Sequence, residues 1–275
     1  MNFVEKLEKI SRQNRSLLCI GLDPDPERMP PGISVYEFNK AIIEATSDLV
    51  CAYKPNFAFY EALGAEGMDA LRRTIKCIPP DIVSIGDGKR NDIGNTAKSY
   101  AKALFDIFGL DGATVNPYLG FDGVEPFLEY KDRGVILLCR TSNSGAADFQ
   151  SLLCETPKGL RPLFEVVADK ARDWNAYGNI GLVVGATYPE ELKLIRQRHP
   201  DLPLLIPGIG AQGGDLMTIV KYGIGPHGDR AIINSSRQVI YASRGKDFAD
   251  AARRIALALR DEINKYRRVR EADLK

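Results

Sequence analysis

Short apolar runs of strand length alternate with amphipathic helical patterns along most of this chain. The runs that predict strands are residues 17–23, 51–56, 82–89, 112–117, 135–141, 180–186, 204–210 and 230–237. The patterns that predict helices are residues 35–49, 59–76, 92–108, 124–131, 160–174, 189–198, 215–222 and 247–266. Eight strand–helix units in about 250 residues are typical of a (β/α)8 barrel, whose parallel strands are apolar throughout because helices cover them. The sequence therefore predicts an α/β fold of the (β/α)8 TIM barrel class, with an open doubly wound sheet as the alternative.

The chain has no internal boundary that would divide it into two domains. Its 275 residues are enough to bury a large core, and no shift in composition or linker rich in proline or serine interrupts them. We expect one barrel domain over residues 1–275, with an N-terminal helix at 1–15 and a C-terminal helix at 247–267.

Charge and composition exclude several classes of function. The 37 basic and 36 acidic residues nearly cancel, which does not favour binding to nucleic acid or to a membrane surface. No apolar run approaches the roughly 20 residues of a membrane span, so we expect a cytoplasmic protein. The five cysteines are scattered without a C-x-x-C motif, and the two histidines lie near no carboxylate or thiol pattern, so no metal site is expected.

Polar side chains gather where the predicted strands end. In a barrel of this class the active site is built at the carboxyl ends of the strands and in the loops that follow. The positions in question are Asp23, Lys54, Asp87 with Lys89, Asn116, the loop 141–145 that contains Ser142, the loop 208–214 that contains Gln212, and Arg237. Seven strand ends with polar residues predict a site at this end of the barrel.

The most informative of these positions is the junction of the third strand and its helix. Asp87 and Lys89 are two residues apart and should share one face of the strand, and Asp92 follows where the strand has ended. Two carboxylates favour the charged form of a lysine between them, which suits proton transfer. A surface salt bridge with a helix cap at Asp92 is the alternative. Lys54, inside an apolar run, needs an acidic partner, and Asp87 or Asp23 would serve; an edge position is its alternative.

The loop after the seventh strand matches G-x-G-x-x-G, which alone is a weak dinucleotide signal. Only one more strand follows it, and that strand ends in Arg237. Barrels commonly bind phosphate with the loops after strands seven and eight, so we interpret residues 208–214 with Arg237 as a phosphate site. Ser142 could bind a ligand or cap a turn, and the residues alone leave both open.

Taken in order, these motifs are those of a known family. They are Gly21-Leu-Asp23, Lys54-Pro-Asn, Asp87-Gly-Lys89-Arg-Asn-Asp92-Ile-Gly-Asn-Thr96, Thr141-Ser142-Asn, Pro207-Gly-Ile-Gly-Ala-Gln212-Gly-Gly and Ser236-Arg237. From about residue 17 to 244 the chain resembles the orotidine 5′-phosphate decarboxylase family in its longer bacterial form. The resemblance implies removal of CO2 from carbon 6 of orotidine 5′-phosphate to give UMP, the last step of de novo UMP synthesis, without a metal or organic cofactor.

The resemblance also implies catalytic roles. Lys89 would protonate carbon 6, and Asp87 would lie against the substrate carboxylate. Family members are homodimers with shared active sites, so Asp92 and Thr96 would come from the partner subunit, with Asp92 completing the charge array.

The remaining roles concern substrate binding. Lys54 and Asp23 would contact the ribose, and Ser142 would bind the pyrimidine amide edge. Gln212 and Arg237 would hold the phosphate. The chain departs from shorter members at Ser236, where they often carry glycine, and over residues 143–159, a longer segment to which the resemblance assigns no contacts.

Three other functions compete with this interpretation. A Schiff-base aldolase also uses a lysine at a strand end and a phosphate site, although its chemistry needs a neutral amine. A metal-dependent phosphosugar decarboxylase or epimerase shares the Asp-x-Lys-x-x-Asp motif. A catalytically silent barrel that binds a nucleotide is the third, and its acid–lysine–acid array would be expected to be broken, whereas this one is intact.

Overall fold

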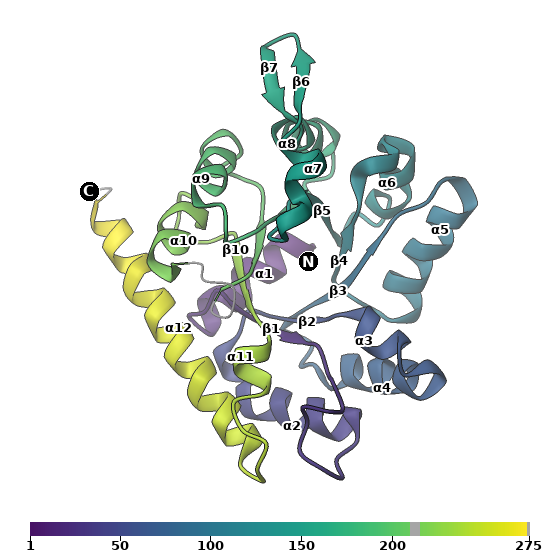
Figure 1. Cartoon of the computed structure of the whole chain (residues 1–275), viewed down its shortest axis with the longest axis vertical. Helices are drawn as coiled ribbons and strands as arrows, with labels where there is room; N and C mark the ends of the chain where they lie inside the picture. Colours follow the sequence, from purple (N-terminus) through teal and green to yellow (C-terminus); the bar gives the residue numbers. More distant parts are fainter. Residues whose placement is uncertain (210–214, 274–275) are drawn as a thin grey trace.

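The computed structural model describes residues 1–209 and 215–273, which form a closed barrel of parallel strands surrounded by helices (Figure 1). Around the barrel the strand order is β1-β10-β9-β8-β5-β4-β3-β2. The barrel strands are β1 Leu18–Leu22, β2 Ala52–Pro55, β3 Val83–Arg90, β4 Gly112–Val115, β5 Gly134–Arg140, β8 Ile180–Val184, β9 Leu204–Pro207 and β10 Ala231–Ser235. Closure between β1 and β10 confirms the predicted TIM barrel and rules out the open sheet. These strands are buried on both faces, as their unbroken apolar character predicted.

Helices follow the strands as the sequence predicted, with shifted ends. They are α1 Phe3–Gln13, α2 Val35–Thr46, α3 Phe57–Glu61, α4 Gly64–Cys77, α5 Gly94–Lys102, α6 Phe121–Leu128, α7 Ala147–Gln150, α8 Leu163–Trp174, α9 Pro189–Arg198, α10 Leu216–Gly223, α11 Arg237–Ile240 and α12 Phe248–Asp273. Single turns of other helix types are η1 Ser47–Leu49, η2 Ala103–Ile107, η3 Pro117–Leu119 and η4 Ser144–Ala146. The predicted helix 59–76 is two helices separated by residues 62–63, and Gly64, the first residue of α4, has the left-handed φ of 63° that the junction requires. Among the described residues, no helix is both long and apolar enough to cross a membrane.

One helix prediction is wrong at its start. Residues 160–162 belong to an antiparallel hairpin, β6 Leu153–Thr156 and β7 Gly159–Pro162, and α8 begins only at Leu163. Gly159 has a φ of 93° and Pro162 is extended, so the chain cannot be helical through these positions. The hairpin projects away from the barrel at the top of Figure 1. Its first strand lies in the longer segment 143–159, to which the resemblance assigned no contacts, and its second strand continues beyond that segment to Pro162.

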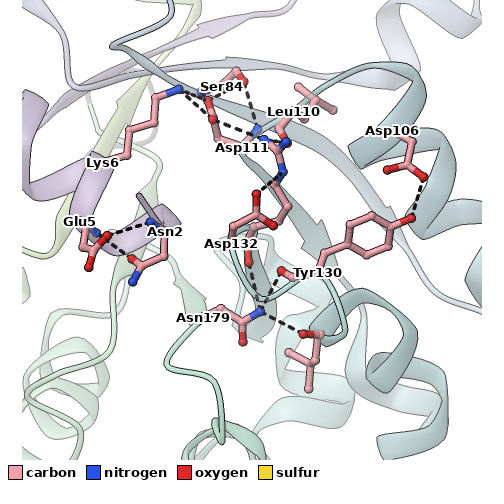
Figure 2. Close-up of polar contacts among 12 residues, drawn as sticks. Asn2, Glu5, Lys6, Ser84, Asp106, Leu110, Asp111, Tyr130, Asp132 and Asn179 are labelled. Carbon is pink, nitrogen blue, oxygen red and sulfur yellow. Dashed lines mark hydrogen bonds and ion pairs between the residues drawn. The ribbon is translucent and has the colours of Figure 1, made fainter.

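Helix α1 closes the amino end of the barrel. The ring of Phe3 lies so close to Gly112 and Gly134 that a Cβ at either position would come within 2.9 or 2.5 Å of it. Next to it, Lys6 Nζ lies 2.7 Å from both carboxylate oxygens of Asp111, which also accepts a hydrogen bond from Ser84 N (Figure 2). The packed ring of Phe3 and the partly buried Lys6–Asp111 ion pair therefore fix α1 against the first residues of the barrel strands. This amino end of the barrel lies opposite the predicted site.

We expect Gly134→Ala to destabilise the protein by about 1–3 kcal/mol, because the new methyl group would lie 2.5 Å from the buried ring of Phe3. Phe3→Leu combined with Gly134→Ala should recover part of that loss, since the smaller side chain leaves room for the methyl group. Urea unfolding of the two single variants and the double variant measures the coupling. Strictly additive free energies of unfolding would show that this contact does not hold α1 in place.

Candidate active site

A cleft opens at the carboxyl end of the barrel and is lined by side chains from several strand ends. Its lining residues are Asp23, Lys54, Asn56, Asp87, Ser142, Pro207, Gly208, Ile209, Asn234, Ser235, Ser236, Arg237 and Gln238. Five of the nine predicted site residues are among them: Asp23, Lys54, Asp87, Ser142 and Arg237. Lys89 joins them through Asp87, whose Oδ1 lies 2.7 Å from Lys89 Nζ. Gln212 lies outside the described residues.

Asp87 is the centre of the polar contacts in this cleft. Its Oδ2 lies 2.7 Å from Lys54 Nζ, and only 5% of the Lys54 side chain and 10% of the Asp87 side chain are exposed. Its Oδ1 pairs with Lys89 and also accepts a hydrogen bond from Thr114 Oγ1 at 2.9 Å. Lys54 is therefore a buried cation with Asp87 as its direct partner, which is the first of the two acids that the sequence suggested.

Burial and charge oppose one another at this ion pair. Burial alone would raise the pKa of the Asp87 carboxyl, but the ammonium groups of Lys54 and Lys89 outweigh it and hold that pKa below its ordinary range. For Lys54 the signs are reversed. Burial alone would lower the pKa of its ammonium group, but the carboxylates of Asp87 and, more weakly, Asp23 raise that pKa above its ordinary value. Both side chains are therefore charged at neutral pH despite being buried.

The backbone of β3 departs from a regular strand at Lys89. The register between β3 and β4 shifts between Gly86 and Arg90, and Lys89 has a φ of 48°, which is uncommon for a residue with a side chain. Thr114 Oγ1 accepts a hydrogen bond from Lys89 N at 3.0 Å and so holds this conformation. The sequence analysis did not single out Thr114; its signal was a hydroxyl inside the otherwise apolar strand β4.

Asp92 and Thr96 are not brought to the cleft by their own chain. The Asp92 carboxylate accepts a hydrogen bond from the backbone of Ile93 at 2.8 Å, and within residues 1–209 and 215–273 it forms no ion pair. Thr96 is exposed in the first turn of α5. A single chain therefore assembles the Asp87–Lys89 half of the predicted acid–lysine–acid array.

Ser236 holds Asp23 at the edge of the cleft. Its hydroxyl lies 2.7 Å from Asp23 Oδ2 and 3.0 Å from the Gly21 carbonyl oxygen, as a bifurcated donor. A Cβ on Gly21 would lie 2.7 Å from that of Ser236, so the serine requires glycine opposite it. Asp23 Oδ1 is buried without a hydrogen-bond partner among the described residues. The serine at this position thus orients a carboxylate, a role that its place in the motif did not reveal.

Ser142 and Arg237 line the cleft from two different strand ends. Ser142 follows β5 and packs on Gly185 after β8, where a Cβ would lie 2.8 Å from Ser142 N. Arg237 follows β10 and is exposed at the start of α11, on the same cleft as Gly208, whose φ is 99°. Glycine is needed at Gly185 for this close approach and at Gly208 for its left-handed turn.

Comparison with known proteins agrees with this geometry. Residues 16–255 match the model of the "Orotidine 5'-phosphate decarboxylase / HUMPS family". The chain is 55% identical over 268 residues to an orotidine 5′-phosphate decarboxylase of Dehalococcoides mccartyi, covering 98% of this chain and 99% of the relative. The chain belongs to the orotidine 5′-phosphate decarboxylase family. This confirms the family that the ordered motifs predicted.

Solved structures agree with the family assignment. The orotidine 5′-phosphate decarboxylase structure from Leishmania donovani is 38% identical, with a TM-score of 0.83, and the alignment covers 97% of this chain and 99% of that chain. The UMP synthase structure from Leishmania donovani is 41% identical, with a TM-score of 0.86 and 97% of this chain covered. This chain spans 57% of the length of that synthase.

We expect Asp87→Asn to lower the free energy of unfolding by about 3–5 kcal/mol at neutral pH, because it leaves Lys54 buried without its carboxylate. The folded-state pKa of Asp87 is depressed, so its stabilisation is present above the unfolded carboxyl pKa of about 4 and is lost as the pH falls below it. The difference between wild type and variant should be constant from about pH 5 to 8 and shrink below about pH 4.

Chemical unfolding across this pH range measures the difference. Glu190→Gln, which changes a surface carboxylate with 76% of its side chain exposed, is the matched control and should shift stability by less than about 0.5 kcal/mol. An Asp87→Asn variant as stable as the control would show that the buried pair does not stabilise the barrel.

Proposed function

We propose that this protein decarboxylates orotidine 5′-phosphate to UMP, the last step of de novo UMP synthesis, without a metal or organic cofactor. Membership of the family supports the reaction class and the substrate. The observation that carries the mechanism is the buried Asp87 carboxylate, held between Lys54 and Lys89 at the carboxyl end of the barrel.

The reaction needs a positive charge beside carbon 6. When the bond from carbon 6 to CO2 breaks, the electron pair stays on that carbon in an in-plane orbital with no adjacent π system to accept it. An ammonium group next to the carbon stabilises the developing negative charge and then donates its proton to the carbon, which yields UMP and a neutral amine. We assign this role to Lys89, whose side chain is 48% exposed and is tethered to Asp87 by its Nζ.

Asp87 would serve Lys89 in two ways. Its carboxylate lies 2.7 Å from Lys89 Nζ and fixes the direction of the lysine side chain. In the substrate complex Asp87 would also lie against the carboxylate that leaves, where like charges repel until CO2 departs. The depressed pKa of Asp87 supports this role, because the group stays ionised at neutral pH.

Substrate groups that do not react would supply the binding energy. Asp23 and Lys54 would bind the ribose hydroxyls, and Ser142 the amide edge of the pyrimidine. Arg237 would pair with the phosphate, together with Gln212. Such contacts remote from carbon 6 can be used to close the site and exclude water around the reacting bond.

The proposal includes a homodimer with shared active sites, in which Asp92 and Thr96 reach the partner subunit's cleft. Two observations support it. Asp92 forms no ion pair with the described residues of its own chain. Ile93, the next residue in the chain, and Tyr118, after β4, are exposed apolar residues, with 58% and 77% of the residue exposed, which a subunit interface would cover. Cytoplasmic location and the absence of nucleic-acid partners stay predictions.

The competing functions make different chemical demands. A Schiff-base aldolase needs a lysine whose amine is free to attack a carbonyl, whereas Lys89 Nζ is paired with the Asp87 carboxylate. Trapping of a substrate adduct by borohydride would favour the aldolase. Loss of activity after treatment with EDTA would favour a metal-dependent phosphosugar enzyme. UMP binding without turnover would favour a silent nucleotide binder.

The direct test is to incubate EDTA-treated protein with orotidine 5′-phosphate, follow the loss of its ultraviolet absorbance, and measure UMP as it forms. Rapid conversion is the expected result. No conversion by folded protein that still binds phosphate would overturn the proposed function.

Lys89→Ala should lower kcat by at least about 10³-fold while UMP binds within about threefold of wild type, because the lysine acts in the chemical step. Lys193→Ala, which removes a surface lysine on α9 with 41% of its side chain exposed, is the control and should leave both unchanged. Steady-state kinetics and calorimetric titration with UMP give the two values. Substantial residual turnover in Lys89→Ala would remove the lysine from this role.

Mixed subunits test the shared site. Lys89→Ala and Asp92→Ala homodimers should each be nearly inactive, whereas a heterodimer of the two should recover activity, because one of its two sites has both residues intact. Differently tagged subunits allow the heterodimer to be purified and verified. An inactive heterodimer would show that Asp92 acts within its own chain or not at all.

A further inference from the structure

Helix α7, in the longer segment after β5, folds back onto the strand end that carries Ser142. Gln150, its last residue, makes two hydrogen bonds with Thr141: Oε1 accepts from Thr141 N at 2.8 Å, and Nε2 donates to Thr141 Oγ1 at 2.8 Å. The Thr141 hydroxyl in turn donates to Asn143 Oδ1 at 2.7 Å. The residues on both sides of Ser142 are therefore held by a network that begins at one side chain, Gln150.

Gln150 is itself fixed by Arg140, a buried cation with only 3% of its side chain exposed. Arg140 Nη1 lies 3.4 Å from Gln150 Oε1, and Nη2 lies 3.5 Å from Glu191 Oε1 on α9. The guanidinium carbon is also 3.6 Å from the centre of the Tyr188 ring, a cation–π distance. The orientation of the Gln150 amide is thus set by a rigid group rather than by solvent.

The loop has a second support beneath it. Gly185 lets the Ser142 backbone approach β8 closely, and Thr187 Oγ1 lies 3.5 Å from the Ser142 carbonyl oxygen. Gly185 sets how closely the loop approaches β8, whereas Gln150 holds Thr141 from α7. The Ser142 side chain, between these supports, lines the cleft.

We propose that Gln150 is a positioning residue for the base-binding part of the site: it fixes residues 141–143 so that Ser142 presents its polar groups to the pyrimidine. This rests on the proposed function, in which Ser142 meets the pyrimidine amide. Gln150 lies in the segment 143–159, which is longer here than in the shorter members of the family, so this role would be one function of that segment. The phosphate side lies away from Gln150, because Arg237 follows β10, which is separated from β5 around the barrel by β9 and β8.

The test compares a ligand with a base and one without. Calorimetric titration with UMP and with ribose 5-phosphate is carried out on wild type, Gln150→Ala and Gln150→Glu. Gln150→Ala should weaken UMP binding about tenfold, the effect of losing one or two hydrogen bonds, and change ribose 5-phosphate binding by less than about twofold. The KM for orotidine 5′-phosphate should rise by a similar factor to the UMP dissociation constant.

Gln150→Glu separates positioning from general stability. Its carboxylate can still accept from Thr141 N and pair with Arg140, so it should restore most of the UMP affinity. Asp148→Ala, on the exposed side of the same short helix, is the matched control and should bind both ligands as wild type does.

The possible outcomes are distinct. Equal weakening of UMP and ribose 5-phosphate in Gln150→Ala, or equal weakening in Asp148→Ala, would overturn the positioning role and show a structural one. Wild-type UMP binding in Gln150→Ala would overturn it as well. Failure of the wild-type protein to bind UMP or to convert orotidine 5′-phosphate would instead refute the proposed function.

Discussion

The buried contact between Lys54 and Asp87 is the interaction on which the site depends. Removing two charges from water costs several kcal/mol for each ion, and only close geometry with further hydrogen bonds offsets that cost. Both conditions are met here, because Asp87 has one oxygen 2.7 Å from Lys54 and the other in contact with Lys89 and Thr114. These side chains come from β2, β3 and β4, so the register of three neighbouring strands must be kept for the pair to form. The ion pair thus links the closure of the barrel to the direction of the lysine that we assign to catalysis.

Asp111, at the amino end of the barrel, and Asp23, at its carboxyl end, differ in how their carboxylates are satisfied. At the amino end, Asp111 is bound by Lys6 and by the backbone and hydroxyl of Ser84, and Phe3 fills the space beside it. At the carboxyl end, Asp23 Oδ1 and Asn234 Oδ1 are buried without partners among the described residues. An unpaired buried acceptor costs about 1–3 kcal/mol, so such groups are expected where a ligand supplies the missing donors.

Much of the fold could be predicted because it depends on local pattern, and the parts that could not depend on contacts between distant residues. The apolar runs in the sequence predicted all eight barrel strands. Because active sites of such barrels lie at the carboxyl ends of the strands, the sequence also predicted that Asp23, Lys54 and Asp87 would share one cleft, and they do. The β6–β7 hairpin was missed because Leu160 continues the helical spacing of α8, while Gly159 and Pro162 decide the backbone. The contacts of Thr114 and Gln150 arise only after folding, since each side chain binds a backbone N–H on another element.

The arrangement of charge in the cleft also limits how a substrate can lie. Lys54 and Lys89 are balanced by Asp87 and, more distantly, Asp23, so the region around β2 and β3 has little net attraction for a dianionic phosphate. Arg237 follows β10, on the other side of β1 and β2, and faces the cleft with its side chain exposed. A nucleotide would therefore span the barrel mouth, with its phosphate at β10 and its base between Lys89 and the Ser142 loop. Under the proposed function, that separation lets the protein bind the phosphate strongly without neutralising the ammonium that carbon 6 requires.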